Sequence, residues 1–198
     1  MKQFINITSY LLDLGYTKEN IIKMAKSLPA IYSYSIENIN KKIFDMIGLG
    51  YTREEVIKMT KSSPTIYNLS IENMNIKIND MIDMGYTRAE VLNMTKSLPT
   101  IYGLSIENIR EKIEFYDSIN MHELAVDDPK QLMQSVALSY ARYNFYLSIG
   151  IEINMVNYKK LFICNKKFEK SYDKTKQEIL EEYNYEKYME EKENGRTL

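Results

Sequence analysis

Hydrophobic and polar positions recur along this chain with a period of 35 residues. The segment LGYTREEVIKMTKSSPTIYNLSIENMNIKI at 49–78 has close copies at 14–43 and at 84–113. In each copy, apolar residues fall at helical spacing in two stretches that a proline separates. A fixed period of this length predicts an array of helix pairs, and no pair buries its apolar stripe unless successive repeats stack.

The second copy shows how one repeat is expected to fold. Gly50 ends the preceding helix, and Thr52 with Glu55 forms a capping box that starts the first helix of the repeat. Pro64 stops that helix, a connector with a 3₁₀ turn follows, and Ser70 caps the second helix. The positions expected to be buried are Val56, Ile57, Met59, Ile71, Met74, Ile78 and Met81, together with the tyrosines Tyr32, Tyr67 and Tyr102 and the methionines Met24 and Met94.

This frame divides the whole chain into repeats. We expect them near 15–49, 50–84 and 85–119, then a diverged repeat at 120–149 with a shortened first helix, and a closing half-repeat at 150–176. From about residue 177 the pattern is lost, and 177–198 is predicted to be an acidic C-terminal helix or a solvated tail.

Both ends of the array carry predicted half-repeats. Residues 1–14 are expected to form a truncated second helix, with Phe4, Leu11 and Leu12 facing inward. The stretch IEINMVNYKKLFICN is predicted to be a further first helix, whose inward positions are Ile153, Val156 and Leu161.

The order LGYT-x-E-E-V-x-K-M-x-x-x-x-P-x-I-Y-x-x-S-I-E-N resembles the repeat motif of the mitochondrial transcription termination factor (mTERF) family. The segment ICNKKFEKSYD at 163–173 also resembles the way in which mTERF chains close, so the resemblance covers about residues 1–175. It implies an all-α superhelical solenoid of about four 35-residue helix pairs with helical caps. It further implies nucleic-acid binding on a basic concave side, in organelle transcription or RNA metabolism.

Charge is distributed unevenly, although the net charge is −1 and the pI is about 6.0, which is low for a dedicated nucleic-acid binder. Residues 159–176 hold seven lysines, and residues 178–193 hold seven glutamates. Phe162, Phe168 and Tyr172 lie among the lysines. This basic segment either grips a single strand through charge and stacking, or its aromatic rings seal the end of the array while the lysines are solvated.

One row of cations recurs on the second helices. Lys42, Lys77 and Lys112 share a position, and Arg142 takes it in the diverged repeat. Stacked repeats would align these charges, as a phosphate backbone requires. The alternative is a solvated ridge that pairs with nearby asparagines or acids. The candidate nucleic-acid-binding residues are Lys42, Lys77, Lys112, Arg142, Lys159, Lys160, Lys166 and Lys167.

Residue types argue against an enzyme. The chain has one histidine, His122, and one cysteine, Cys164, so we expect neither a histidine-based triad nor a His/Cys metal cluster within it. Its glycines mark repeat ends and do not form a phosphate loop. We expect no catalytic residues, no metal and no cofactor, and a cytoplasmic protein without a targeting or membrane-spanning segment.

Two functions remain open at this level. The first is a non-enzymatic nucleic-acid-binding repeat protein that regulates transcription or RNA metabolism by occupancy. The second is a protein-interaction solenoid from a bacterium or mobile element that binds and inhibits a nucleic-acid-handling protein machine. The expected partners are therefore nucleic acid, DNA or RNA, or such a protein, and neither a membrane nor a small-molecule substrate.

Overall fold

The computed structural model describes the backbone of residues 2–193 and the side chains of residues 5–190. Over this range the chain is all-α, which confirms the predicted array of helix pairs joined by 3₁₀ turns. It forms two compact units, Met1–Ile106 and Glu107–Leu198. None of the described helices combines the length and the apolar composition that crossing a membrane requires.

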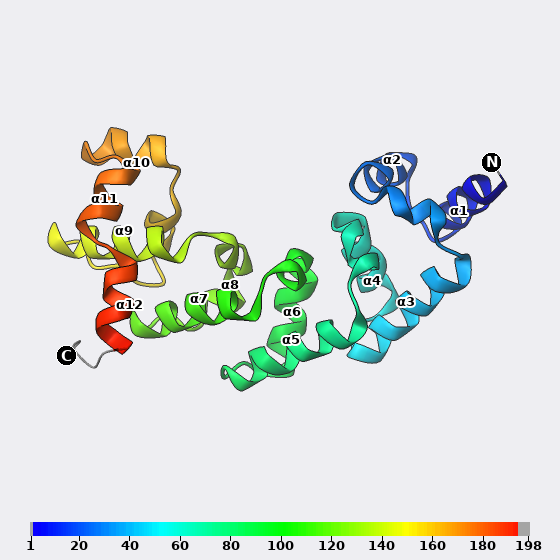
Figure 1. The fold of residues 1–198 in the computed structure, drawn as a ribbon, viewed down its shortest axis with the longest axis horizontal. Helices are drawn as coiled ribbons and strands as arrows, with labels where there is room; N and C mark the ends of the chain where they lie inside the picture. The colour runs from blue at the N-terminus through cyan, green and yellow to red at the C-terminus, as the bar shows by residue number, and fades with distance from the viewer. Residues whose placement is uncertain (1, 194–198) are drawn as a thin grey trace. The chain divides into compact units, whose positions relative to one another are not determined.

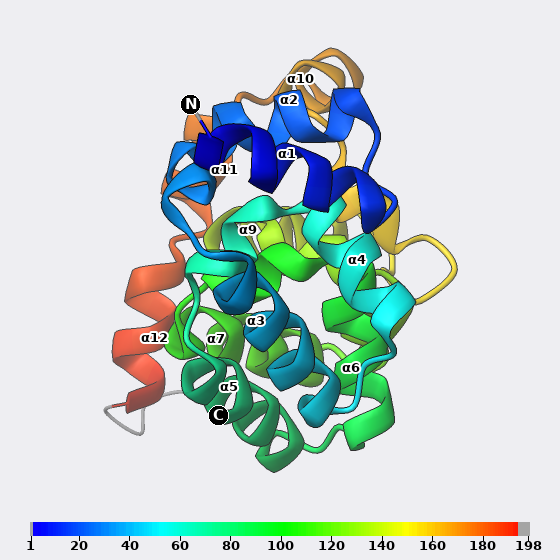
Figure 2. The same ribbon diagram turned by 90° about the vertical axis from the view of Figure 1, so that its right-hand side faces the viewer.

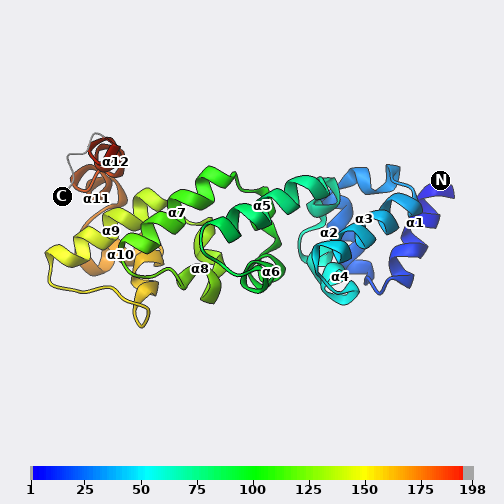
Figure 3. The ribbon, with the colours of Figure 1, turned by 90° about the horizontal axis from the view of Figure 1, so that it is seen from below.

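The first unit contains α1 and two and a half further repeats (Figure 1). Its elements are α1 (Lys2–Asp13), α2 (Lys18–Ser27), η1 (Pro29–Ser33), α3 (Ile36–Leu49), α4 (Arg53–Ser62), η2 (Pro64–Asn68), α5 (Ile71–Asp83), α6 (Arg88–Ser97) and η3 (Pro99–Gly103), where η denotes a 3₁₀ helix. Helix α1 lies beside α2, as Figure 2 shows. Figure 3 separates the second helices α3 and α5 from the first helices α4 and α6.

The second unit begins with a second helix and ends with three shorter ones. Its elements are α7 (Ile106–Ser118), α8 (Leu124–Asp127), η4 (Pro129–Met133), α9 (Val136–Ser148), η5 (Tyr158–Phe162), α10 (Asn165–Tyr172), α11 (Lys176–Glu182) and α12 (Tyr185–Glu193). The four-residue α8 agrees with the predicted shortening of the first helix in the diverged repeat.

Each repeat is delimited by the caps that its sequence specifies. The Thr52 hydroxyl accepts the N–H of Glu55, and the Glu55 carboxylate accepts the N–H of Thr52 at 2.9 Å. Thr17 forms the same capping box with Asn20, whose side-chain oxygen replaces the carboxylate. Gly50 closes α3 with φ of +115°, a left-handed conformation that side chains with a Cβ rarely adopt.

The core follows the predicted stripes. Met59 is fully buried, as are its counterparts one repeat away on either side, Met24 and Met94. Tyr67 and Tyr102 are buried at the repeat boundaries, whereas Tyr32 is half-buried. Leu11 is buried but Leu12 is exposed, so the prediction for Leu12 is wrong, and the Phe4 side chain lies outside the described residues.

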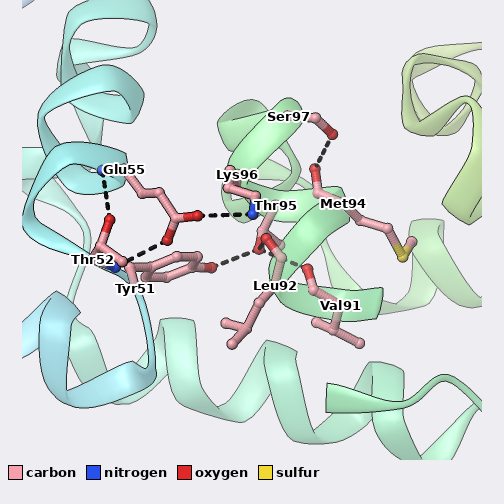
Figure 4. Close-up of polar contacts among 9 residues, drawn as sticks. All are labelled: Tyr51, Thr52, Glu55, Val91, Leu92, Met94, Thr95, Lys96 and Ser97. Atoms are coloured by element: carbon pink, nitrogen blue, oxygen red, sulfur yellow. Dashed lines mark hydrogen bonds and ion pairs between the residues drawn. The ribbon is translucent and has the colours of Figure 1, made fainter. Parts of the chain in front are cut away.

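A buried chain of hydroxyl groups crosses each of two repeat boundaries in the first unit. The Thr95 hydroxyl donates to the Val91 carbonyl at 2.7 Å, and the Tyr51 hydroxyl oxygen lies 2.5 Å from that of Thr95 (Figure 4). The Tyr51 hydroxyl also bonds that of Tyr102. Tyr16, Thr60 and Tyr67 repeat this arrangement one boundary earlier. A tyrosine hydroxyl is protonated at neutral pH, and burial raises the pKa of Tyr51 further, so this boundary retains its hydroxyl bonds there.

The segment after α9 departs from prediction. Residues 151–157 form no helix, and η5 takes the place of the connector that proline begins in the earlier repeats. Ile153 and Leu161 are buried as expected, but the Val156 side chain is 94% exposed. The predicted first helix is therefore wrong, because the chain omits it and goes directly to the connector.

The repeat pattern continues into the C-terminal residues. Asp173 is left-handed, with φ of +52°, and Thr175 with Glu178 forms a capping box that starts α11. Helices α11 and α12 both pack against α9, where the Tyr188 ring stacks on that of Tyr140 with centroids 4.8 Å apart. The expectation of a solvated tail is thus corrected for residues 177–193, since both helices are docked.

Two glycines near the end of α3 differ in their backbone conformation, and alanine substitutions should therefore affect stability in opposite directions. Gly48 lies in the helix with open space around it, so Gly48→Ala should raise the free energy of unfolding by up to about 1 kcal/mol. Gly50→Ala should lower it by about 1–2 kcal/mol, because its φ is positive and an added Cβ would lie 2.9 Å from Leu92 Cδ1. Urea unfolding of both variants checks this, and equal shifts would contradict it.

Candidate nucleic-acid interface

The predicted cation row points across repeat boundaries in the first unit. Lys42 on α3 is 9% exposed, and its ammonium group donates to the carbonyl of Leu69, the residue that ends η2. The half-buried Lys77 on α5 donates to the Tyr102 carbonyl in η3 at 2.5 Å. A helix end leaves its last carbonyls without partners. Each lysine therefore satisfies a carbonyl of the following repeat.

Arg142 makes both of these contacts at once in the second unit. Its Nη1 atom donates to the Leu161 carbonyl at 2.8 Å and to the Ile163 carbonyl at 2.6 Å. Counted from the start of each 3₁₀ helix, Leu161 corresponds to Tyr102 and Ile163 to Leu69. The two N–H groups of one guanidinium nitrogen thus serve two carbonyls, whereas each lysine bonds one.

Lys112 is also removed from solvent. It is 4% exposed, and its ammonium group donates to the Asn108 side chain one turn earlier on α7. Arg142 is 2% exposed and lies over the Phe168 ring, with Cζ 4.9 Å from the centroid.

The expectation of four solvent-facing charges is corrected by these contacts. Lys42, Lys112 and Arg142 are buried, so neither a solvated ridge nor an open line of charge describes them. Burial holds the pKa of Lys42 down at about 8, partly opposed by the Asp45 carboxylate, and it lowers the pKa values of Lys112 and Arg142 as well. Direct contact of this row with nucleic acid stays a prediction.

Exposed cations of the first unit gather instead on the first helices. They recur with the 35-residue period, and this recurrence can be read from the sequence as easily as that of the buried row. The exposed or half-exposed members are Lys18, Lys23 and Lys26 on α2, Arg53, Lys58 and Lys61 on α4, and Arg88 and Lys96 on α6. Lys26, Lys61 and Lys96 lie in the last turns of these helices, where a cation also favours the helix dipole.

Among the second helices of the same unit, acids outnumber cations on α5, whereas α3 holds two of each. Helix α5 holds three acids against one lysine, the half-buried Lys77, while α2 holds three lysines against one glutamate. On α3 the exposed Lys41 pairs with Asp45 at 2.6 Å. Charge is therefore divided between the two helix rows, although the whole chain is close to neutral.

Grooves of similar size lie at two successive boundaries on the second-helix side. One, of about 310 Å³, is lined by Asn38, Lys42, Asp45 and Tyr67 among others. The next, of about 360 Å³, is lined by the residues one period on: Asn73, Lys77, Asp80 and Tyr102. In both grooves the lysine amino group is held by a carbonyl, and an acid lies on the wall.

In the predicted basic segment near the C-terminus, the lysine side chains are largely exposed, but the ring of Phe168 is not. Lys159, Lys166 and Lys167 are exposed, and Lys160 is half-exposed with its ammonium 5.9 Å from the Tyr146 ring centroid. Phe168 is buried, and its ring packs against Phe145 with centroids 5.2 Å apart. The aromatic residues therefore close the array, which excludes base stacking on Phe168.

Comparison with known proteins identifies a family. The model of the mTERF family matches residues 1–168 of this chain. Proteins of that family are non-catalytic helical-repeat proteins that bind nucleic acid. No curated protein matches the chain.

Removing one cross-repeat contact should destabilise the fold. Lys77→Met keeps the apolar stem but leaves the Tyr102 carbonyl without its donor, so the free energy of unfolding should fall by about 1–2 kcal/mol. Lys58→Met removes an exposed charge and should change it by less than about 0.5 kcal/mol. Chemical denaturation of both variants makes the comparison, and an unchanged Lys77→Met midpoint would show that the contact contributes nothing.

The lowered pKa of Lys42 gives stability a specific pH dependence. Its pKa is about 8 when folded and 10.5 as the ordinary value, so between these the unfolded chain binds more protons. Stability from this group therefore rises as the pH increases through that window. Between about pH 7.5 and about pH 9.5, the unfolding free energy of the wild type should rise relative to that of Lys42→Met. Parallel pH profiles would refute the shift.

Proposed function

Because the chain belongs to the mTERF family, we propose that it binds nucleic acid through phosphate contacts made by its first helices, and that it regulates transcription or RNA metabolism by occupancy. The observation that carries this proposal is the division of charge in the first unit. Its exposed cations recur on α2, α4 and α6, whereas acids dominate the second helix α5.

Phosphate binding needs cations that water and ligand can reach. Lys23 and Lys58 occupy equivalent positions on α2 and α4, and both are exposed. Lys18 and Arg53 are likewise equivalent and exposed, at the first residues of the same helices. A repeat array places equivalent positions at regular intervals, which suits the regular spacing of phosphates in a strand.

The exposed lysines near the C-terminus supply a second set of contacts in this proposal. Lys159, Lys166 and Lys167 retain the role predicted for them, as charges that meet phosphate without base stacking. The buried row acts indirectly, because Lys42, Lys77 and Arg142 hold adjoining elements in register.

The near-neutral composition is compatible with such binding. Long-range attraction is weak for a chain of net charge −1, so affinity depends on local charge and falls steeply with salt. Acids outnumber cations on α5, α11 and α12, whereas cations outnumber acids on α2 and α4, although these two helices also carry Glu19, Glu54 and Glu55.

Binding to labelled single- and double-stranded DNA and RNA across a salt series tests the proposal. The variant Lys23→Gln/Lys26→Gln removes two exposed first-helix charges. We expect weaker binding and a log–log salt slope that is less steep by roughly 1.4–1.8, at about 0.7–0.9 per lost phosphate contact.

The matched control removes two exposed cations from second helices. Lys41→Gln/Arg110→Gln lowers the net charge by the same amount and should leave the slope close to that of the wild type. Equal effects of the two variants would indicate attraction by net charge and would refute a first-helix interface. If the wild type binds no nucleic acid at low salt, the proposal fails and a protein partner becomes the better hypothesis.

A further inference from the structure

A groove on α4 brings together three cations and a single acid. It measures about 350 Å³ and is lined by Leu14, Arg53, Glu54, Ile57, Lys58 and Lys61. Leu14, which follows α1, and Ile57 form its apolar part, and Glu54 is its single acid. Among the described residues, no hydrogen bond or ion pair involves the side chains of Arg53, Lys58 or Lys61.

The next repeat boundary shows the same positions closed by bonds. Lys96, which corresponds to Lys61, forms an ion pair with Glu55 at 2.8 Å (Figure 4). Arg88, which corresponds to Arg53, donates to the Leu49 carbonyl at 2.7 Å. The Glu55 carboxylate is ionised at neutral pH, and the hydrogen bond from Lys96 lowers its pKa further, so Glu55 offsets the charge of Lys96.

The two boundaries differ at several positions, since Ala89 and Asn93 replace Glu54 and Lys58, but the position that sets the partner of Lys61 is Asn20. Asn20 stands where the next repeat has Glu55, and its side-chain oxygen accepts the Thr17 N–H at 3.1 Å. The capping box is preserved, but the carboxylate is missing. Lys61 lies over the Tyr16 ring instead, with its ammonium 5.4 Å from the centroid. A cation on an aromatic face keeps its charge available to a further partner.

We infer that this groove is an anion subsite that takes one phosphate group, and that the equivalent boundary between α4 and α6 is not. Arg53 supplies the planar fork that suits phosphate oxygens, and Lys58 and Lys61 add point charges. The volume is within the range of small-ligand sites. This inference rests on the proposed function for its natural ligand, which is a phosphate of the bound strand.

Exchanging one residue at each boundary tests the inference. Asn20→Glu supplies Lys61 with the carboxylate that Lys96 has, and should weaken oligonucleotide binding roughly twofold to fivefold, the range of one exposed ion pair. Glu55→Asn frees Lys96 and should strengthen binding by a similar factor. Both variants keep a residue that already serves in a capping box of this chain, so their thermal stability should stay near that of the wild type.

The outcomes separate this inference from the proposed function. If the wild type binds oligonucleotides and neither exchange alters affinity beyond a general charge effect, the subsite is refuted while the function stands. A charge effect is measured with Glu72→Asn, which removes an exposed second-helix acid and should leave affinity nearly unchanged. Opposite shifts in the two exchange variants, larger than this control, support the subsite.

Inorganic phosphate distinguishes a strand phosphate from a free one. Phosphate is titrated into the wild type and Asn20→Glu at constant ionic strength, and binding is followed by the NMR signal of the Arg53 guanidinium. A saturable shift in the wild type that Asn20→Glu abolishes supports the subsite even if no oligonucleotide binds. No response to phosphate, together with unaltered oligonucleotide binding in both exchange variants, overturns it.

Discussion

The array depends on satisfying carbonyl groups at the ends of three of its 3₁₀ helices, η2, η3 and η5. A 3₁₀ turn stops after five residues in every repeat, and the groups at its end have no partner within it. A cation from the preceding second helix supplies that partner at η2, η3 and η5. Because the donor lies 19 to 27 residues from its acceptor, the bond ties adjoining repeat elements together.

This constraint explains why the fourth member of the row is an arginine. The half-repeat after α9 lacks an α-helical first helix and begins its connector without proline, so less packing holds η5 in place. Arg142 bonds two carbonyls of that segment and the Asn165 side chain at 3.0 Å. A positive charge that persists through divergence here indicates backbone satisfaction, whereas in the sequence alone the same persistence favoured a phosphate contact.

Much of the fold was accessible from the sequence because its signals are local. Capping boxes, the proline before each 3₁₀ turn and the apolar stripes fix the helices within a repeat. The sequence does not show which way a lysine side chain points. Its four-carbon stem can reach solvent or a neighbouring repeat equally well from one helix position. The error at Val156 has a related origin: the spacing of Ile153 and Leu161 suits both a helix and the compressed connector. The start of α11 was not recognised in the sequence, because Asp173 takes the left-handed position that glycine holds in earlier repeats.

Repetition of the backbone does not imply repetition of the binding surface. The boundaries of the first unit share hydroxyl bonds and capping boxes, yet one amino acid decides whether the lysine at the end of the first helix has a carboxylate partner. Glu55 has two acceptor oxygens and can serve Thr52 and Lys96 at once, whereas Asn20 has one and serves Thr17 alone. A position whose structural task tolerates both residues is thus free to set the local charge. In such an array, ligand contacts can be changed one boundary at a time without altering the packing that holds the repeats together.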